Sequence, residues 1–350
     1  MDQEETPSQT SRPSPTASQV DVARLARVSQ AAVSRVFTPG ASVSEQTRQR
    51  VLDAAYKLNY RPNAIARSLI RKSTRMIGVV VMRLAKPFYA RVLHEFMRGL
   101  QSHGYWTLLF DIADDDEIEL TLPMALQYQV DGVVITSATL SSRLADEFAR
   151  TGTPVVLFNR YAATGKTHVV RCDNYSGGRL VADAFLDAGH QRIAYIAGEE
   201  GSSTNQDRRR GLVDRLQERG VQLWQSAPGD YSYEAGYAGA SALLSRAEKP
   251  HAIFCADDLT AIGALDAARQ EFRLRVPQDL SVIGFDDIPM ASWGAYALTT
   301  IRQPFEEMVA VTIRQLLAAI EDPTAKTEDH VVPPTLVVRS SARLALQPER

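Results

Sequence analysis

From Met76 onward, short apolar runs alternate with segments of helical periodicity. Helical patterns cover Phe88–Ser102, Tyr175–Ala188, Asp207–Arg219 and Leu259–Glu271. The apolar runs are Ile77–Met82, Trp106–Phe110, Gly132–Thr136, Val155–Phe158, Ile193–Ala197, Ala252–Cys255 and Leu280–Phe285. Strands that are apolar throughout and alternate with helices predict a parallel sheet with helices on both faces.

The same region contains a faint internal repeat. Ile77–Val81 leads into a helix bearing Arg98-Gly99-Leu100, and Ile193–Ala197 leads into a helix bearing Arg210-Gly211-Leu212. The repeat predicts two similar α/β lobes in tandem. Ligands of such sheets lie beyond the carboxyl ends of the strands, so we expect a small-molecule site in the cleft between the lobes.

The N-terminal part has a different pattern. Residues 1–17 are rich in Ser, Thr, Pro and Gln, which is typical of a disordered tail. Three helices are then predicted, each after a serine that can cap its first turn. They follow Ser18, Ser29 and Ser44, and the last two are expected at Gln30–Phe37 and Glu45–Asn59. With a tight turn between the first two, residues 18–61 are predicted to form a helix-turn-helix domain.

The charge of the chain is divided unevenly. Residues 19–75 contain eleven Lys or Arg and three acidic residues, a net charge of +8. Residues 1–18 carry −2, and the remainder must carry −8 for the whole chain to reach −2. A compact basic segment on an acidic body is typical of a protein that binds a polyanion such as DNA. A solvated helical surface would be the alternative interpretation.

Length and composition set further limits. The 350 residues are enough for two or three domains. No apolar run approaches the ~18–20 residues that span a bilayer, and the polar, acidic N-terminus lacks the pattern of a secretory signal. We therefore expect a cytoplasmic protein. Cys172 and Cys255 are expected to be free, buried thiols, although two distant thiols could also pair.

The sequence disfavours two other classes of protein. An enzyme is disfavoured because the sequence contains no Walker loop, Gly-x-Gly-x-x-Gly motif, metal-ligand cluster or nucleophile elbow, and its six histidines are dispersed. We expect no cofactor and no metal. A periplasmic solute-binding protein would fit the two lobes, but it would need a signal peptide and would have no use for the basic N-terminal segment.

Several motifs occur in a fixed order along the chain. The N-terminal ones are Asp21-Val22-Ala23, Val28-Ser29-Gln30-Ala31-Ala32-Val33-Ser34-Arg35-Val36, Val43-Ser44-Glu45-Gln46-Thr47-Arg48, Leu58-Asn59-Tyr60-Arg61-Pro62-Asn63, Ala66-Arg67-Ser68-Leu69 and Ile77-Gly78-Val79. Later ones are Val130-Asp131-Gly132-Val133-Val134, Ala188-Gly189-His190-Gln191-Arg192-Ile193-Ala194, Asp257-Asp258 and Ser281-Val282-Ile283-Gly284-Phe285-Asp286-Asp287. In these motifs the chain resembles the LacI/GalR family of transcription regulators.

The resemblance covers nearly everything after residue 17. It implies an N-terminal all-α helix-turn-helix domain and an α/β two-lobed periplasmic-binding-protein-like (type I) core. One departure lies in the turn of the helix-turn-helix, where the family commonly has Gly and this chain has Arg27. A positive φ at that position would strain Arg slightly, and the extra charge can help near phosphates.

The resemblance also implies which residues face DNA. In a recognition helix the N-terminal side chains enter the major groove, which here points to Gln30 and Ala31, with Arg35 one turn further. Gln30 suits adenine, Arg35 suits guanine, and Ala31 can touch a thymine methyl. Arg35 could instead contact a phosphate. Ser29, Ser34, Ser44 and Thr47 suit phosphate contacts, and Ser29 and Ser44 could serve only as helix caps.

Residues 62–75 are expected to form the hinge helix and linker. In this family two hinge helices enter the minor groove, and a leucine from each wedges a base step. Leu69 takes that place, with Ala66 beside it and Asn63 near the backbone. Leu69 could instead pack on the core. Because so short a helix is not stable alone, the mechanism requires a homodimer on a pseudo-palindromic double-stranded operator.

For the effector, the resemblance points to the cleft between the lobes, and the expected site residues are Phe88, Tyr89, Thr136, Asn159, Arg160, Arg208, Tyr231, Asp257 and Asp286. Carboxylates and Arg forks at strand ends suit sugar hydroxyls. Arg160 and Arg208 together suggest an anionic group such as a sugar acid, but Asp257 and Asp286 offset their charge. Any one of these residues could instead form a salt bridge between lobes.

The expected effector-binding and dimerisation domain is residues 76–350. Its N-lobe is predicted at about 76–173 and 304–331, and its C-lobe at about 174–303 and 332–346. The chain ends without an appended leucine heptad, which favours a dimer over a tetramer. Ligand is expected to change the spacing of the two hinge segments, and the sequence leaves open whether the effector is an inducer or a corepressor.

Overall fold

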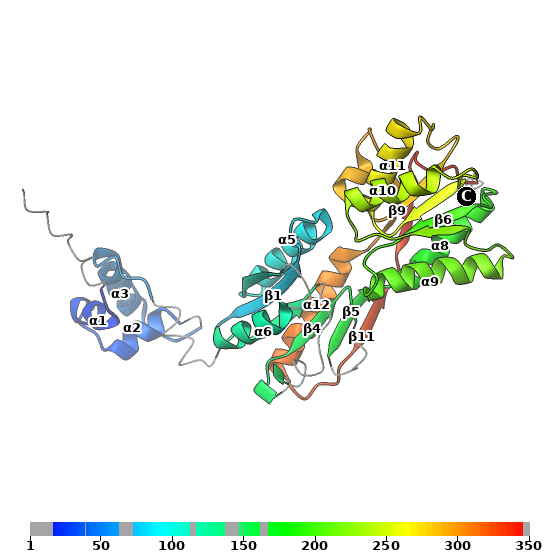
Figure 1. Cartoon of the computed structure of the whole chain (residues 1–350). Coiled ribbons are helices and arrows are strands. Elements are labelled where there is room, and N and C mark those ends of the chain that lie inside the picture. The colour runs from blue at the N-terminus through cyan, green and yellow to red at the C-terminus, as the bar shows by residue number, and fades with distance from the viewer. Residues whose placement is uncertain are drawn as a thin grey trace, which may run out of the picture. The chain divides into compact units, whose positions relative to one another are not determined.

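The computed structural model describes residues 17–38, 40–62, 73–112, 117–136, 147–148, 150–161 and 167–345. The chain divides into two compact units, Met1–Thr74 and Arg75–Arg350, and each is described by itself (Figure 1). The predicted tail, apart from residue 17, and the hinge residues Asn63, Ala66 and Leu69 lie outside the described residues.

The first unit contains three helices, α1 (Gln19–Ala26), α2 (Gln30–Val36) and α3 (Glu45–Lys57). Serines 18, 29 and 44 cap them, as the sequence predicts, and Ser18 forms a reciprocal capping box with Asp21. Each helix contributes one fully buried valine to a small core; these are Val22, Val33 and Val51. Arg27 has a φ of 55°, so the turn between α1 and α2 does require the left-handed conformation.

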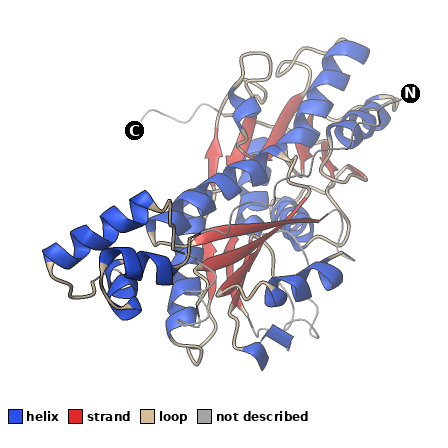
Figure 2. Cartoon of the chain, turned by 90° about the vertical axis from the view of Figure 1, so that its left-hand side faces the viewer, coloured by secondary structure: helices blue, strands red, loops and turns tan. Residues whose placement is uncertain are grey.

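The second unit contains two six-stranded sheets (Figure 2). In the order of their pairing, the strands of the N-lobe are β11 (Asp329–Val332), β5 (His168–Cys172), β4 (Val155–Phe158), β3 (Gly132–Ile135), β1 (Met76–Met82) and β2 (Trp106–Ile112). Those of the C-lobe are β12 (Thr335–Val337), β10 (Thr299–Arg302), β9 (Ser281–Asp286), β8 (Ala252–Cys255), β6 (Ile193–Ile196) and β7 (Gln225–Ala227). The two orders correspond strand for strand, so the structure contains the repeat that the sequence indicates.

All pairs are parallel except β10 with β12. The β1 strand is buried on both faces, as expected for a parallel sheet. Its residues alternate between two apolar clusters: Ile77, Val79 and Val81 belong to the larger one, and Val80 and Met82 to the smaller one. The sheet therefore needs helices on both sides.

The helices are α5 (Pro87–Ser102), α6 (Ile118–Gln127), α8 (Asn174–Asp187), α9 (Ser203–Glu218), α10 (Tyr233–Leu244), α11 (Asp258–Asp266) and α12 (Phe305–Glu321). Helix α12 follows a strand of the C-lobe but packs on α5 and on the N-lobe strands. Helix α8 follows an N-lobe strand but packs on α9. The chain thus passes between the lobes after β5, after β10 and between β11 and β12.

Several details differ from the sequence-based expectation. The third helix ends at Lys57 rather than Asn59. The helical pattern over Leu259–Glu271 continues beyond α11 only as a π-helical turn, Ala267–Glu271. Helices α6, α10 and α12 and strands β5, β7, β10, β11 and β12 were not predicted. In the described part of the chain, no helix is both long and apolar enough to cross a membrane.

Candidate functional site

The first candidate surface lies on α2 and the turn before it. Ser29, Gln30, Ala31, Ser34 and Arg35 are all exposed, while the opposite face of the helix enters the core of the unit. The core is therefore complete without these side chains, and they are free to meet a partner. An exposed, polar N-terminal turn is the part of a helix that reads a DNA groove.

Two predicted phosphate contacts also act as helix caps. The Oγ atom of Ser29 accepts a hydrogen bond of 3.2 Å from the backbone N–H of Ala32, which leaves its own proton available. Ser44 accepts from the N–H of Thr47 at 3.3 Å and donates to the hydroxyl of Thr47 at 3.0 Å. The geometry thus favours a capping role for Ser44, whose proton is already engaged.

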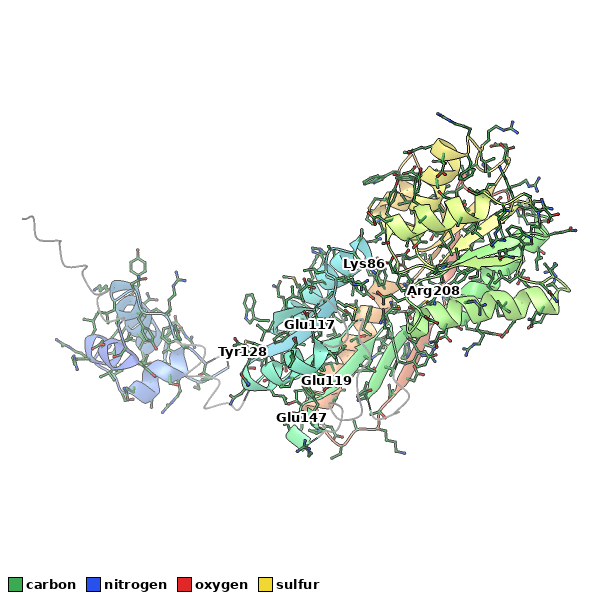
Figure 3. The ribbon with its side chains drawn as sticks, viewed as in Figure 1. Lys86, Glu117, Glu119, Tyr128, Glu147 and Arg208 are labelled. Carbon is green, nitrogen blue, oxygen red and sulfur yellow. The ribbon has the colours of Figure 1, made fainter. Side chains whose placement is uncertain are left out.

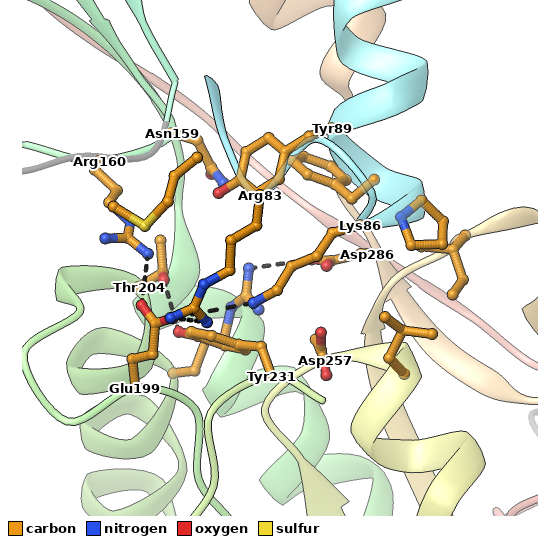
Figure 4. A pocket seen from close by; sticks show the side chains of 16 residues that line it. Arg83, Lys86, Tyr89, Asn159, Arg160, Glu199, Thr204, Tyr231, Asp257 and Asp286 are labelled. Carbon is orange, nitrogen blue, oxygen red and sulfur yellow. Dashed lines mark hydrogen bonds and ion pairs between the residues drawn. The ribbon is translucent and has the colours of Figure 1, made fainter. Parts of the chain in front are cut away.

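The second candidate site is a pocket between the lobes of the larger unit (Figure 4). Its empty space is about 570 Å³, including its mouth, a size suited to a small ligand. The lining residues come from the carboxyl ends of strands in both sheets and from the loops and helices that follow those strands: Met82, Arg83, Lys86, Pro87, Phe88, Tyr89, Asn159, Arg160, Glu199, Thr204, Arg208, Tyr231, Asp257, Leu259, Asp286 and Ile288. Lys86 of one lobe and Arg208 of the other, both labelled in Figure 3, are among these lining residues.

Close packing of two helices places Arg208. A side chain at Gly178 of α8 or at Gly211 of α9 would collide with the backbone of the other helix, so both positions need glycine. This approach brings the Nε of Arg208, on α9, to 2.8 Å from the Oδ1 of Asn174 at the start of α8. The guanidinium carbon lies 3.6 Å from the centre of the Phe285 ring.

Arg208 is otherwise held by acceptors at strand ends. Its Nη1 donates to the carbonyl of Ala256, and its Nη2 donates to the Oδ1 of Asp286 at 3.2 Å. Three of its five N–H groups are therefore committed. The side chain is a buried, fixed fork with two donors left for a ligand.

The floor of the pocket carries buried carboxylates. Asp257 caps α11 by accepting from the N–H of Thr260 at 2.9 Å, and burial raises its pKa. Burial also raises the pKa of Asp286 to about 6, even though Arg208 opposes the shift. Asp286 additionally accepts from the Nε2 of Gln303 at 2.6 Å. Both carboxylates can accept hydrogen bonds from ligand hydroxyl groups.

Aromatic rings form the walls. The Phe88 and Tyr89 rings meet edge to face at 5.3 Å. The hydroxyl of Tyr231 is anchored among the hydroxyls of Ser202 and Thr204, at 3.0 and 2.9 Å. Anchored rings of this kind offer a rigid apolar face to a sugar or a flat ligand.

The backbone of the pocket is unusual. Four lining residues have a positive φ: Arg83 at 55°, Asn159 at 67°, Tyr231 at 64° and Asp286 at 110°. Asn and Asp are the two of these residue types that adopt a positive φ more often than others, mostly near 60°, and Asp286 lies well beyond that value. Strained residues cluster at functional sites, where the surrounding structure holds them in place, so this cluster supports a binding role for the pocket.

Cationic side chains of the N-lobe reach a single carboxylate of the C-lobe. Arg83 and Lys86 follow β1, Arg160 follows β4, and all three point to Glu199, which follows β6. The distances from their nitrogens to the Glu199 oxygens are 2.7, 4.0 and 3.3 Å. Burial lowers the pKa of Lys86, and the nearby carboxylates of Asp257 and Glu199 oppose that shift.

Eight of the nine residues predicted to bind effector line this pocket: Phe88, Tyr89, Asn159, Arg160, Arg208, Tyr231, Asp257 and Asp286. The ninth, Thr136, does not line it, because its hydroxyl donates to the carbonyl of Val80 at 3.1 Å and so completes the sheet. Sequence reasoning missed Arg83, Lys86, Glu199 and Thr204. Arg83 and Glu199 each follow the first strand of a repeat, and this shared position in the two lobes is the sequence signal that could have identified them.

No group of His, Cys, Asp and Glu among the described residues could hold a metal ion. Both cysteines are buried and free, which confirms the prediction. Burial raises the pKa of Cys172 to about 12 and that of Cys255 well above its ordinary value. Neither thiol is therefore a candidate nucleophile.

Comparison with known proteins agrees with this arrangement. Residues 20–63 match the family described as bacterial regulatory proteins, lacI family, and residues 182–342 match the periplasmic binding protein-like domain. The ribose operon repressor of Haemophilus influenzae is 33% identical over 325 residues, which cover 92% of this chain and 97% of that protein. The chain belongs to the LacI family. Its predicted family and fold class are thereby confirmed.

Two further similarities cover nearly the whole of this LacI-family protein. The repressor PurR of Mannheimia succiniciproducens is 32% identical over 329 residues, covering 92% of this chain and 98% of that one. The crystal structure of the lac repressor dimer bound to operator and the anti-inducer ONPF superimposes with a TM-score of 0.85 at 27% identity, covering 95% of this chain and all of that one. These relatives are transcriptional repressors, which places this chain among regulators rather than enzymes.

Proposed function

We propose that this chain is a transcriptional repressor that binds a pseudo-palindromic operator as a homodimer in the cytoplasm. The observation that carries the proposal is the exposed polar turn of α2, which the core of its unit does not use. Gln30 would read adenine and Arg35 guanine, Ala31 would approach a thymine methyl, and Ser29 and Ser34 would hold phosphates. Thr47 would add a phosphate contact at the start of α3, where Ser44 serves as the helix cap.

Residues 62–75 would supply the hinge. Leu69 would wedge a base step in the minor groove, with Ala66 beside it and Asn63 near the phosphates. Within this scheme residues 18–61 bind the major groove, and residues 76–350 bind effector and form the dimer. Two hinge segments on one site require two chains, as in the lac repressor dimer on its operator.

We further propose that a small polar ligand, a sugar or a sugar acid, occupies the pocket between the lobes and controls operator affinity. The two free donors of Arg208 and the carboxylates of Asp257 and Asp286 suit hydroxyl groups, and the Tyr89 and Tyr231 rings suit the carbon skeleton. The pocket draws on both lobes, so a ligand there binds one relative orientation of the lobes better than another. That difference is what couples ligand to DNA.

Selection of duplexes from random DNA, followed by titration at several salt concentrations, tests the DNA-binding part. We expect one pseudo-palindromic consensus and an affinity that falls steeply with salt. Arg35→Ala should weaken the selected site by about 1–3 kcal/mol and relax its sequence preference. Arg24→Ala removes another exposed positive charge, from α1, and is the matched control, expected to leave the preference unchanged. Binding without any sequence preference would refute the proposal.

A further inference from the structure

Glu199 is the meeting point of three cationic side chains from the opposite lobe (Figure 4). The contact with Arg83 is short, at 2.7 Å between Nη1 and Oε1. The contact with Arg160 is longer, at 3.3 Å between Nη2 and Oε2, whereas good charge-assisted hydrogen bonds are about 2.7–2.9 Å. Glu199 therefore satisfies Arg83 but only partly satisfies Arg160.

Arg160 is left with a vacant donor. The residue is only 8% exposed, and its Nε has no hydrogen-bond partner in the structure. The Nε–H and Nη2–H groups form the side-on fork with which arginine binds a carboxylate through two parallel hydrogen bonds. Arg171 shows the filled arrangement in this chain, since its Nε and Nη2 each lie 3.0 Å from an oxygen of Asp329. In Arg160 the Nε–H group has no acceptor, and the Nη2–H group has only the long hydrogen bond to Glu199.

The residue beside Arg160 is unsatisfied too. Asn159 is 5% exposed, and its Oδ1 has no hydrogen-bond partner. Both residues line the pocket. A buried polar atom without a partner is rare in a folded protein and calls for a missing partner. Here two consecutive residues each have an unpaired group: the Nε–H donor of Arg160 and the Oδ1 acceptor of Asn159.

Arg208, by contrast, already has its counter-charge. Its Nη2 is bonded to Asp286, and its Nε and Nη1 are used within the lobe. Arg160 and Arg208, which line the pocket from opposite lobes, therefore differ. Arg208 offers hydrogen bonds with a compensated charge, and Arg160 offers an open carboxylate fork.

We infer that the effector is a polyhydroxy carboxylate, and that its carboxylate takes the place of Glu199 on the Arg160 fork. This inference rests on the proposed function and narrows its ligand class. Glu199 is then an internal stand-in for the ligand's acid group. The Oδ1 of Asn159 accepts from a ligand hydroxyl near the carboxylate, and the remaining hydroxyls face Asp257, Asp286 and Arg208.

Titration calorimetry and thermal shift on the full chain test this inference with matched pairs that differ in the acid group. The pairs are D-gluconate with D-glucitol and D-glucuronate with D-glucose, and D-glucose 6-phosphate serves as an anion of another shape. We expect at least one acid to bind, its neutral counterpart to bind at least tenfold more weakly, and the phosphate not to replace it. These comparisons use the natural sequence, so no variant has to fold.

Three variants test the role of Glu199. Glu199→Gln removes the competing negative charge and should tighten binding of the acid several-fold. Arg160→Lys keeps the positive charge but loses the pair of parallel donors, so it should weaken binding of the acid at least tenfold. Glu200→Gln makes the same change one residue away, on an exposed side chain, and should have no effect. The inference would be overturned if a neutral sugar bound as tightly as its acid or more tightly, or if the phosphate were preferred. It would also be overturned if Glu199→Gln bound the acid more weakly, or if no acid bound at all.

These failures are separable from failure of the proposed function. If the chain binds its selected operator but none of the acids, the proposed repressor function stands and only the inferred ligand class is refuted. If the chain binds an acid but shows no preference among DNA sequences, the proposed function is refuted.

Discussion

Replacing Arg208 by leucine should destabilise the larger unit strongly, and in a way that depends on pH. Arg208 is 2% exposed and is the ion-pair partner of Asp286. Breaking a buried pair by removing one member costs about 3–5 kcal/mol. Even with Arg208 present, burial holds the pKa of Asp286 at about 6, against 3.8 for the free side chain, which corresponds to about 3 kcal/mol against the charged form.

The direction of the pH effect follows from that pKa. Because the folded-state pKa of Asp286 is raised, the folded state binds more protons than the unfolded state between about pH 4 and 6. The contribution of this group to stability is therefore highest below pH 4, falls as the pH rises through that window, and is flat above it. Without Arg208 the pKa rises further, so the fall extends to higher pH. Arg208→Leu should consequently cost more at pH 8 than at pH 5.5.

Urea unfolding followed by tryptophan fluorescence measures this effect. All three tryptophans, Trp106, Trp224 and Trp293, lie after residue 75, so the signal reports the larger unit alone. Arg208→Leu with Asp286→Asn should lose less stability than Arg208→Leu alone, because the uncompensated charge is gone. A loss below about 1 kcal/mol at pH 8, or an equal loss at both pH values, would refute the reasoning.

Three smaller predictions concern other parts of the chain. Ser29→Ala removes the cap of α2 and should lower the stability of the first unit by about 1 kcal/mol, read from its thermal unfolding by circular dichroism. Gly211→Ala introduces a methyl group against the backbone of α8, so it should destabilise the larger unit by more than about 1 kcal/mol in the urea assay; an unchanged midpoint would show that the helices can separate freely. Cys172 and Cys255 should resist thiol reagents at pH 8 in the folded protein and react on unfolding, and rapid labelling of the native chain would contradict their burial.

Much of the architecture was predictable because it rests on local patterns. The serine caps of α1, α2 and α3 are fixed by hydrogen bonds within one helical turn. The apolar central strands are buried on both faces, which leaves a continuous apolar run in the sequence. Arg27 stood out as the residue in place of Gly, and its positive φ agrees with that interpretation.

The missed elements lack such local signals. Strand β7 is short, contains Gln225 and Ser226, and lies at a sheet edge. Helix α6 contains Pro123, which normally argues against a helix interior. Helix α12 packs on the lobe opposite to the strand it follows, so its position depends on contacts between distant segments.

The pocket shows the same division. Arg160 and Asp286 were found because they stand at or just after strand ends and match a family pattern, and Arg208, on α9, was found from the family pattern alone. Thr136 stands at a strand end too, but its hydroxyl faces the sheet rather than the pocket, and a sequence pattern does not distinguish these two directions. Glu199 was missed because its importance comes from three cations that converge on it from another lobe.

The central claim is that the pocket between the lobes controls binding of DNA by the helix-turn-helix unit. Its most direct test is the fluorescence anisotropy of a labelled, selected operator titrated with the full chain, with and without a ligand shown by calorimetry to bind. The account predicts that saturating ligand changes the operator Kd by about 5-fold or more, in either direction, and that Arg160→Lys loses this change at the same ligand concentration. An operator Kd that is identical with and without bound ligand would contradict it.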